Sequence, residues 1–299
     1  VTFTNGINIA SARFGVNVLG GSGTYTFGSA SNTSTINTIS APSLGVSGTS
    51  TASVVYHGNI TQGGTGLPAG SVRISDHSIG TVTLSSGTIS DPVSTGFEFT
   101  NADGTYIFNS TANLSSAAGG GISIGPGSDG SFTFNDANLT GSGSSLVIGD
   151  ANGIQSQSPD VNFNGTINRT SGSGFAVDIN RITDDGSNQI SITPTTFSET
   201  TGSGVSINQT AVDVSVSNMN INGGIDGIQI TSSTGTMDFS NASIQNLSGT
   251  PIAISTDASS LTYQGSIAHA GSGAVLNIND HTTGTITLSG GSDSISATN

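Results

Sequence analysis

The stretch GIQITSSTGTMDFSNASIQNLSGTPIAI, residues 227–254, decides the fold of this chain. Its apolar residues come in three short segments before the series starts again: Ile228 and Ile230, Met237 and Phe239, Ile244, then Ile252 and Ile254. Alternation with a period of two is typical of strands that bury one face. Gly, Ser, Thr and Asn fill the intervals and favour tight turns. The stretch therefore predicts one coil of three short strands.

The same unit recurs along the chain. The inner position of the second segment recurs every 23 to 29 residues: Phe3, Phe27, Tyr56, Leu84, Phe108, Phe134, Phe163, Ile192, Val216, Phe239, Tyr263 and Leu288. The third segment is marked by Ile89, Leu114, Leu139, Ile167, Phe197, Ile221, Ile244 and Ile267. We expect one domain over residues 1–299, less regular over 1–70 and regular over 71–299, whose twelve second-segment residues form a continuous core ladder.

The repeat length selects the architecture. A period near 25 is too short for a four-stranded propeller blade, and the Leu/Asn pattern of leucine-rich repeats is missing. The sequence thus predicts an all-β, right-handed, three-sided parallel β-helix of about 11–12 coils of roughly 23–30 residues. Coils stacked about 4.8 Å apart would give a rod roughly 50 Å long.

Composition narrows the classes of function. Of the 299 residues, 7% are charged, and 18 carboxylates against four basic residues give a net charge of −14. Nucleic acid is an unsuitable partner, because phosphate binding needs clustered Lys and Arg. There is no cysteine for disulfides or thiolate metal sites. No apolar run approaches 18 residues, so we expect no membrane span.

Two stretches carry a family resemblance: residues 227–254, quoted above, and AVLNINDHTTGTITLSGG, residues 274–291. They resemble the right-handed β-helix repeats of large bacterial secreted proteins, namely autotransporter passengers, filamentous haemagglutinin-like adhesins and β-strand repeat surface proteins. The resemblance covers nearly the whole chain, but its motifs are structural. It implies a β-helical fold, an extracellular or cell-surface location and a role in surface structure.

Some enzymes that cleave glycans share the β-helix fold, so a catalytic site has to be considered. They use clustered acids with nearby Arg or Lys, and the best local candidate here is Asp178, Arg181, Asp184 and Asp185. An Asp-Arg pair on a corner loop is more often a solvated salt bridge, so we predict no catalytic residue. Calcium in corner loops is the one cofactor to consider, with ligands drawn from Asp129, Asp136, Asp150, Asp184 and Asp185.

Two dipeptides look like a paired motif, Asp76-His77 and Asp280-His281. They lie eight coils apart, about 40 Å by strand spacing, and cannot form one site. We interpret them as the same corner in related repeats.

Two functions remain open. The first is a non-catalytic structural rod of an extracellular fibre, adhesin or surface layer. It is favoured because the apolar pattern starts at Val1 and Phe3 and continues to Ile295, without polar caps. Its partners would be copies of the chain or further coils of the same polypeptide, end to end, besides a glycan or a cell surface. The alternative is a glycan-binding or glycan-cleaving β-helix, which would need a concave groove on one face.

Overall fold

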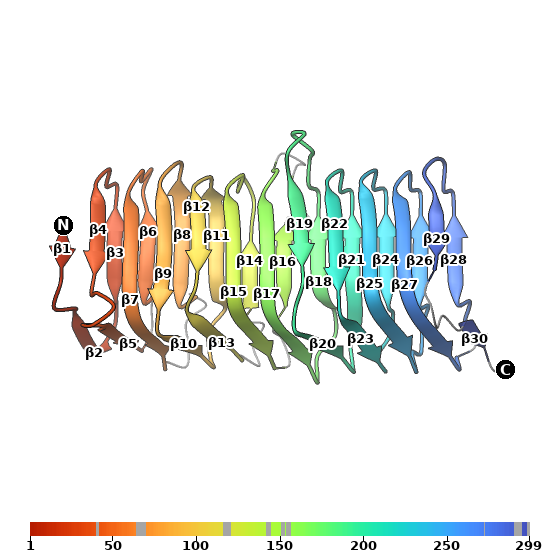
Figure 1. Cartoon of the computed structure of the whole chain (residues 1–299), viewed down its shortest axis with the longest axis horizontal. Helices are drawn as coiled ribbons and strands as arrows, with labels where there is room; N and C mark the ends of the chain where they lie inside the picture. Colours follow the sequence, from red (N-terminus) through yellow and green to blue (C-terminus); the bar gives the residue numbers. More distant parts are fainter. Residues whose placement is uncertain are drawn as a thin grey trace.

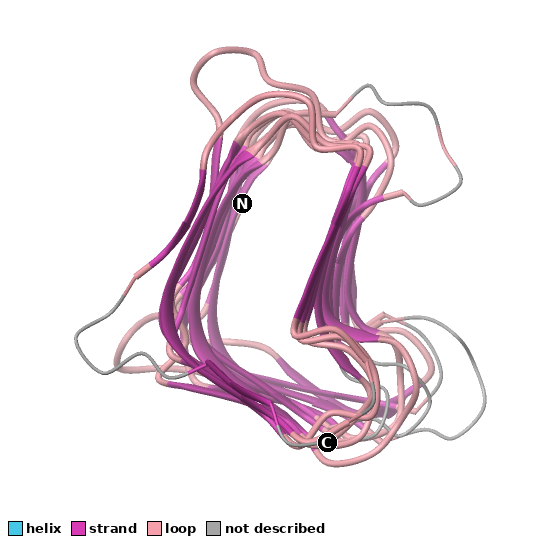
Figure 2. Cartoon of the chain, turned by 90° about the vertical axis from the view of Figure 1, so that its right-hand side faces the viewer, coloured by secondary structure: helices cyan, strands magenta, loops and turns pink. Residues whose placement is uncertain are grey.

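The computed structural model describes residues 1–39, 42–63, 70–115, 121–141, 145–150, 153, 157–271, 273–289 and 295–297. These residues form strands and no helix, and the pairings between strands are parallel. Accordingly, nothing in the described part of the chain is a helix long and apolar enough to cross a membrane. The strands stack as a parallel β-solenoid of about eleven coils, each with three faces (Figures 1 and 2).

The first face is an eleven-stranded sheet in which each strand between the two edges pairs with the coil before and the coil after. Its strands are β3 (Val16–Leu19), β6 (Leu44–Ser47), β8 (Val72–His77), β11 (Gly96–Ala102), β14 (Gly121–Ile124), β16 (Leu146–Gly149), β18 (Phe175–Asn180), β21 (Ser203–Asn208), β24 (Ile228–Thr231), β26 (Ile252–Ser255) and β28 (Leu276–Asn279).

The second and third faces together make the other sheet. The second face contains β1 (Thr2–Phe3), β4 (Thr24–Phe27), β9 (Thr81–Ser86), β12 (Thr105–Phe108), β19 (Gln189–Ile192), β22 (Asp213–Ser217) and β29 (Ile286–Leu288). The third contains β2 (Asn8–Ala12), β5 (Ser34–Thr38), β10 (Thr88–Asp91), β13 (Thr111–Leu114), β20 (Thr196–Glu199), β23 (Met219–Asn222) and β30 (Ile295–Ala297). Longer strands turn the corner and serve both faces: β7 (Ser53–Gln62), β15 (Ser131–Thr140), β17 (Asp160–Arg169), β25 (Thr236–Gln245) and β27 (Ser260–His269).

The path of the chain gives the solenoid its hand. In Figure 1 the second face runs downward in front, the third crosses below, and the first returns upward behind while the chain advances from left to right. Seen end on in Figure 2, with the C-terminal end toward the viewer, this circulation is anticlockwise. The solenoid is therefore right-handed.

The ladder of second-segment residues runs unbroken through the pairing register, from Phe3 opposite Phe27 to Tyr263 opposite Leu288. Its ten inner members are buried, from Phe27 to Tyr263. The two end members differ from the prediction, since Phe3 is 44% exposed and Leu288 is only partly buried. An end coil covers a side chain from one direction only, which explains the difference.

Two strand positions differ from the sequence prediction. The apolar alternation in the sequence predicts an inward pair of Phe175 and Val177. The inner pair of β18 is instead Val177 and Ile179, which pair with Leu146 and Ile148, whereas Phe175 is half-buried at the start of the strand. A third-face strand that the apolar pattern did not reveal, β5, buries Ile36 between Ser34 and Thr38. Its inner positions are mostly polar, so the alternation of apolar residues is lost there.

Among the corners that the structure describes, one loop departs clearly from the repeat. Residues 184–188, between β18 and β19, are exposed or half-buried and rise above the neighbouring corners in Figure 1. The repeat from Phe163 to Ile192 is one of the longest, so the sequence predicts a protruding loop here. The sequence predicts a second protruding loop over residues 153–158, in the equally long repeat from Phe134 to Phe163, and this loop lies partly outside the described residues.

Glycine is required where β17 turns from the second face to the third. Gly165 has φ +151°, and a Cβ built there would lie 2.1 Å from the carbonyl oxygen of Ala137 in the preceding coil. Gly186, with φ +90°, lies in the exposed loop with nothing within 4 Å of such a Cβ. The two glycines share an unfavourable φ and differ in the space around them.

We therefore expect Gly165→Ala to destabilise the protein by more than Gly186→Ala. The control bears only backbone strain, about 1 kcal/mol, whereas Gly165→Ala also forces two coils apart. Urea denaturation of both variants measures the difference. Equal midpoints would show that the coils are not packed as closely at this corner as the structure has them.

Candidate functional site

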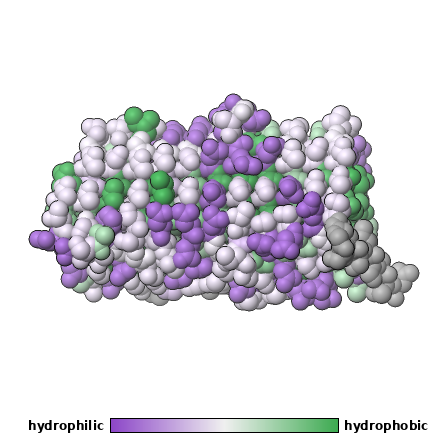
Figure 3. All heavy atoms as spheres, viewed as in Figure 1, coloured by the Kyte–Doolittle hydropathy of each residue, from purple (hydrophilic) through white to green (hydrophobic). Residues whose placement is uncertain are grey.

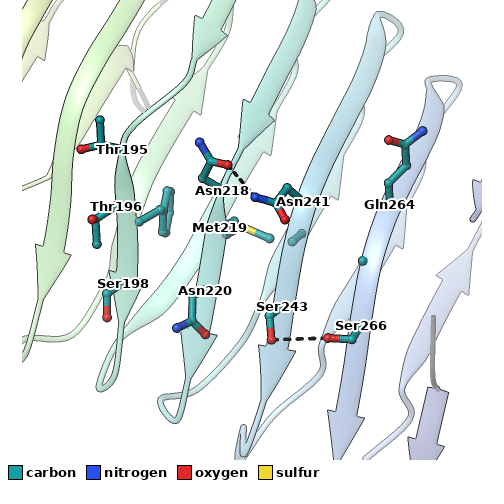
Figure 4. Close-up of a pocket in the computed structure, with 13 residues that line it drawn as sticks. Thr195, Thr196, Ser198, Asn218, Met219, Asn220, Asn241, Ser243, Gln264 and Ser266 are labelled. Atoms are coloured by element: carbon teal, nitrogen blue, oxygen red, sulfur yellow. Dashed lines mark hydrogen bonds between the residues drawn. The ribbon is translucent and has the colours of Figure 1, made fainter. Parts of the chain in front are cut away.

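A polar groove lies on the outside of the third face (Figure 4). It has a volume of about 1020 Å³ and crosses four coils, over β20, β23, β25 and β27. One row of outward side chains is in pairing register across these strands: Ser198, Asn220, Ser243 and Ser266. A second row, at the corner with the second face, consists of Asn218, Asn241 and Gln264.

The corner row owes its shape to two left-handed residues. Asn218 and Asn241 have φ of 57° and 50°, a conformation that Asn tolerates better than most residues. The Asn241 Nδ2 donates to the Asn218 Oδ1 at 2.7 Å, and the Asn218 Nδ2 donates to the Pro194 carbonyl at 2.8 Å. These bonds fix the amides along the rod axis. In Figure 4 the side chains of Asn220 and Gln264 extend from the neighbouring strands.

The chemistry of the groove is limited to neutral hydrogen bonding. Its thirteen described lining residues include no Asp, Glu, His, Lys or Arg. Amides and hydroxyls can both donate to and accept from a polar ligand, but they do not move protons as general acids or bases at neutral pH. The arrangement can therefore hold an uncharged polar chain, and it lacks the paired carboxylates of a glycosidase.

The four residues considered for catalysis are not joined by a contact among themselves: Asp178 lies on β18 in register with Val147 and Ser206, and the other three bond elsewhere. The Arg181 guanidinium donates to the Gly153 carbonyl. The Asp184 Oδ1 accepts the Gly186 amide at 2.7 Å, and the Asp185 Oδ1 accepts the Ser187 amide at 3.1 Å. Among the described residues, the ion pairs of arginine are Arg73–Glu98 and Arg169–Glu199, so the salt bridge expected for this loop is not formed. These two loop carboxylates instead stabilise their own turn.

The candidate calcium ligands are likewise dispersed. The Asp129 Oδ1 accepts the Ser158 amide at 2.7 Å, and the Asp136 Oδ2 accepts the Thr111 hydroxyl at 2.6 Å. Within the part of the chain that the structure describes, no three Asp, Glu or His side chains are grouped to hold a metal ion. Calcium at Asp129, Asp184 or Asp185 stays a prediction.

The two Asp-His dipeptides occupy equivalent corners. Asp76 and Asp280 are both left-handed, with φ of 52° and 53°, and both lie at the end of first-face strands, eight strands apart in the sheet. His77 is buried, whereas His281 retains 15% exposure and approaches the Asp257 carboxylate at 3.9 Å. The corner recurs, but the contacts of the histidine do not.

His77 holds three coils together. Its Nε2 lies 2.9 Å from the Ala52 carbonyl and its Nδ1 lies 2.8 Å from the Tyr106 hydroxyl. A neutral ring satisfies both contacts if Nε2 donates and Nδ1 accepts. Burial lowers the pKa of His77 below its ordinary value of 6.5, against the opposing effects of the Ala52 carbonyl and Asp103.

This lowered pKa predicts a pH dependence of stability. The unfolded chain protonates His77 near pH 6.5 and the folded chain only at lower pH, so this contribution is complete above 6.5 and is lost as pH falls through the folded-state pKa. We expect the unfolding free energy of the parent to fall more between pH 7 and pH 5 than that of His77→Gln. Urea titrations at each pH measure the two slopes, and parallel profiles would contradict the assignment.

One buried ion pair escaped the sequence analysis. Arg169 and Glu199 pair in register on β17 and β20, with the Arg169 Nε 3.4 Å from the Glu199 Oε2, and both side chains are buried. The signal was available, because each residue lies two positions after an inward apolar residue, Ile167 or Phe197. If the inward alternation of each strand is continued by two residues, the Arg169 and Glu199 side chains both point into the core.

The structure thus shows a parallel β-solenoid of about eleven turns with a neutral groove, and the likeness to secreted surface proteins remains a prediction from the repeat. What the chain does has to be inferred from its own residues. Comparison with known proteins finds no matching family model, no similar curated protein and no similar solved structure.

Proposed function

We propose that this chain is a non-catalytic structural rod of an extracellular fibre, adhesin or surface layer, and that its stack continues into further coils at its ends. The observation that carries the proposal is the exposure of apolar ladder positions in both end coils. Phe3 is 44% exposed and Ile278 is 45% exposed, whereas their neighbours in the next coil, Phe27 and Ile254, are buried. In Figure 3 hydrophobic residues reach the surface at the right-hand edge, where the last coils lie.

The backbone of the end coils supports the same inference. The described edge of the first-face sheet is β3 at one end and β28 at the other, and each pairs with one neighbour only. Unpaired edges of parallel strands are templates for another strand, and apolar side chains beside them add to the attraction. A further parallel coil would satisfy both features. A second copy of the chain, or more of the same polypeptide, would supply it.

Side chains between neighbouring coils also suit a structural role. Exposed asparagines bond along the axis: Asn135 to Asn109 at 2.6 Å, Asn138 to Asn113 at 3.1 Å, and Asn246 to Asn222 at 2.8 Å. These amides join coil to coil, and stability is distributed along the rod as in other solenoids.

Sedimentation over a concentration series tests the proposal. We expect the parent chain to associate, and Ile278→Lys to weaken that association at least tenfold by placing a charge at the end coil. Ile225→Lys is the matched control, because Ile225 is also 45% exposed but lies in a corner loop within the rod. Monodisperse monomers of the parent, stable at high concentration, would contradict end-to-end continuation.

The third-face groove favours glycan binding as a second candidate function. Its two polar rows follow the rod axis, one over four coils and the other over three. Their neutral amides and hydroxyls match the hydroxyls of an uncharged oligosaccharide. The absence of acid–base groups from the lining argues for binding without cleavage. Calorimetric titration with neutral oligosaccharides tests this, and Asn220→Ala should weaken any binding while Asn135→Ala, outside the groove, should not.

A further inference from the structure

A second, more enclosed hollow lies on the outside of the first face, over β3, β6 and β8. It has a volume of about 370 Å³, within the range of small-ligand pockets. The outward residues of these strands lie in register as Asn17, Gly45 and Arg73. Because Gly45 has no side chain, the row is interrupted there, and the end of the Asn17 side chain lies over Gly45.

Two loop residues wall this pocket, Phe14 and Pro42. The Phe14 ring is 62% exposed, and the Arg13 guanidinium carbon lies 5.6 Å from its centroid. An exposed phenyl ring offers a flat apolar surface to a ligand.

The pocket also gathers positive charge. Arg73 contributes a side chain that is 57% exposed, and its contact with Glu98 is long, 3.8 Å from Nε to Oε2. Arg73 lines the pocket, and Arg13 lies against Phe14, one of its walls, in a chain with four basic residues and a net charge of −14. Guanidinium groups bind carboxylates through paired hydrogen bonds, and a ligand carboxylate could approach Arg73 more closely than Glu98 does.

We propose that this pocket binds a sugar that carries a carboxylate, of the uronic acid class. The carboxylate would pair with Arg73, and one face of the ring would lie on Phe14. The hydroxyls would bond with Asn17 and with Ser75, which also lines the pocket. A polyanion such as nucleic acid would need more than two cations. A fully apolar ligand would make no hydrogen bond with Arg73 or Asn17. This inference is independent of the end-to-end assembly proposed above, and either can fail alone.

Gly45 keeps the pocket open. A Cβ built there would lie 2.8 Å from the Asn17 Oδ1, the end of a flexible side chain, and the φ of Gly45 is not in the left-handed region. A larger residue at this position therefore fills the pocket without straining the backbone.

Calorimetric titration with three probes tests the proposal: glucuronate, glucose, which lacks the carboxylate, and benzoate, which lacks the sugar hydroxyls. We expect glucuronate to bind at least tenfold more tightly than either, since a charge-assisted pair and several hydroxyl contacts each contribute. Arg73→Gln and Phe14→Ala should each weaken glucuronate binding about tenfold, and Gly45→Val should abolish it. Gly45→Ala, a smaller change, should weaken it even if Gly45→Val folds poorly.

A change that strengthens binding makes the test sharper. Glu98→Gln removes the competing carboxylate and should tighten glucuronate binding, an effect that a merely structural role of Arg73 would not produce. Arg181→Gln, on a distant corner, is the control and should leave binding unchanged. Absence of glucuronate binding at millimolar concentration, or benzoate binding as tight as glucuronate, would overturn the assignment.

Discussion

Phe134→Asp is expected to lower the unfolding free energy by several kcal/mol. The Phe134 side chain is fully buried, and its ring stacks on that of Phe108 with centroids 5.0 Å apart and an interplanar angle of 10°. Deleting a buried phenyl ring costs roughly 3–5 kcal/mol, and a carboxylate left in its place adds an unpaired charge in an apolar interior.

Thr133→Asp is the matched control, since Thr133 is the next residue and points outward on the same strand. Its effect should stay within about 0.5 kcal/mol. Urea denaturation followed by circular dichroism compares the two variants. A Phe134→Asp protein with near-parent stability would show that the ladder register is wrong.

The second large effect is expected at the buried pair of Arg169 and Glu199. Arg169→Met leaves the Glu199 carboxylate buried without its cation, which typically costs about 3–5 kcal/mol. The Glu199 Oε1 would still accept the amides of Thr201 and Gly202, at 2.9 and 2.7 Å, so the corner keeps part of its bonding. We therefore expect a severe but not complete loss.

The double variant Arg169→Met, Glu199→Leu separates pairing from packing. Replacing a buried ion pair by apolar residues of similar size is often nearly neutral, so the double variant should be more stable than Arg169→Met alone. Unfolding free energies of the parent, both single variants and the double variant complete the cycle. Additive losses, with no recovery, would mean that the two charges do not interact.

The sequence predicted the coils well wherever apolar residues alternate. The ladder from Phe27 to Tyr263 required only a period of two within strands and a repeat near 25 between them. The inward residues were predicted wrongly where inward positions are polar, or where a strand contains more than one possible pair of alternating apolar residues. Ile36 lies alone among Ser and Thr, and Phe175 has an apolar partner at the correct spacing but begins the strand too early.

The candidate sites were harder to predict for a different reason. The groove joins Ser198, Asn220, Ser243 and Ser266, which are common polar residues that become one row only when the register is known. The Arg73 pocket depends on a missing side chain at Gly45. The sequence alone suggests sites from residues that are adjacent in the chain, such as Asp184 and Asp185. The structure instead brings together residues that lie one coil apart.

Electron microscopy of the native material tests the central claim, that this chain is a segment of a continuing rod, most directly. The account predicts fibres or rods much longer than the roughly 50 Å that about eleven coils span, with coils repeating about every 4.8 Å along the axis. Discrete particles about 50 Å long, with both end coils open to solvent, would contradict it.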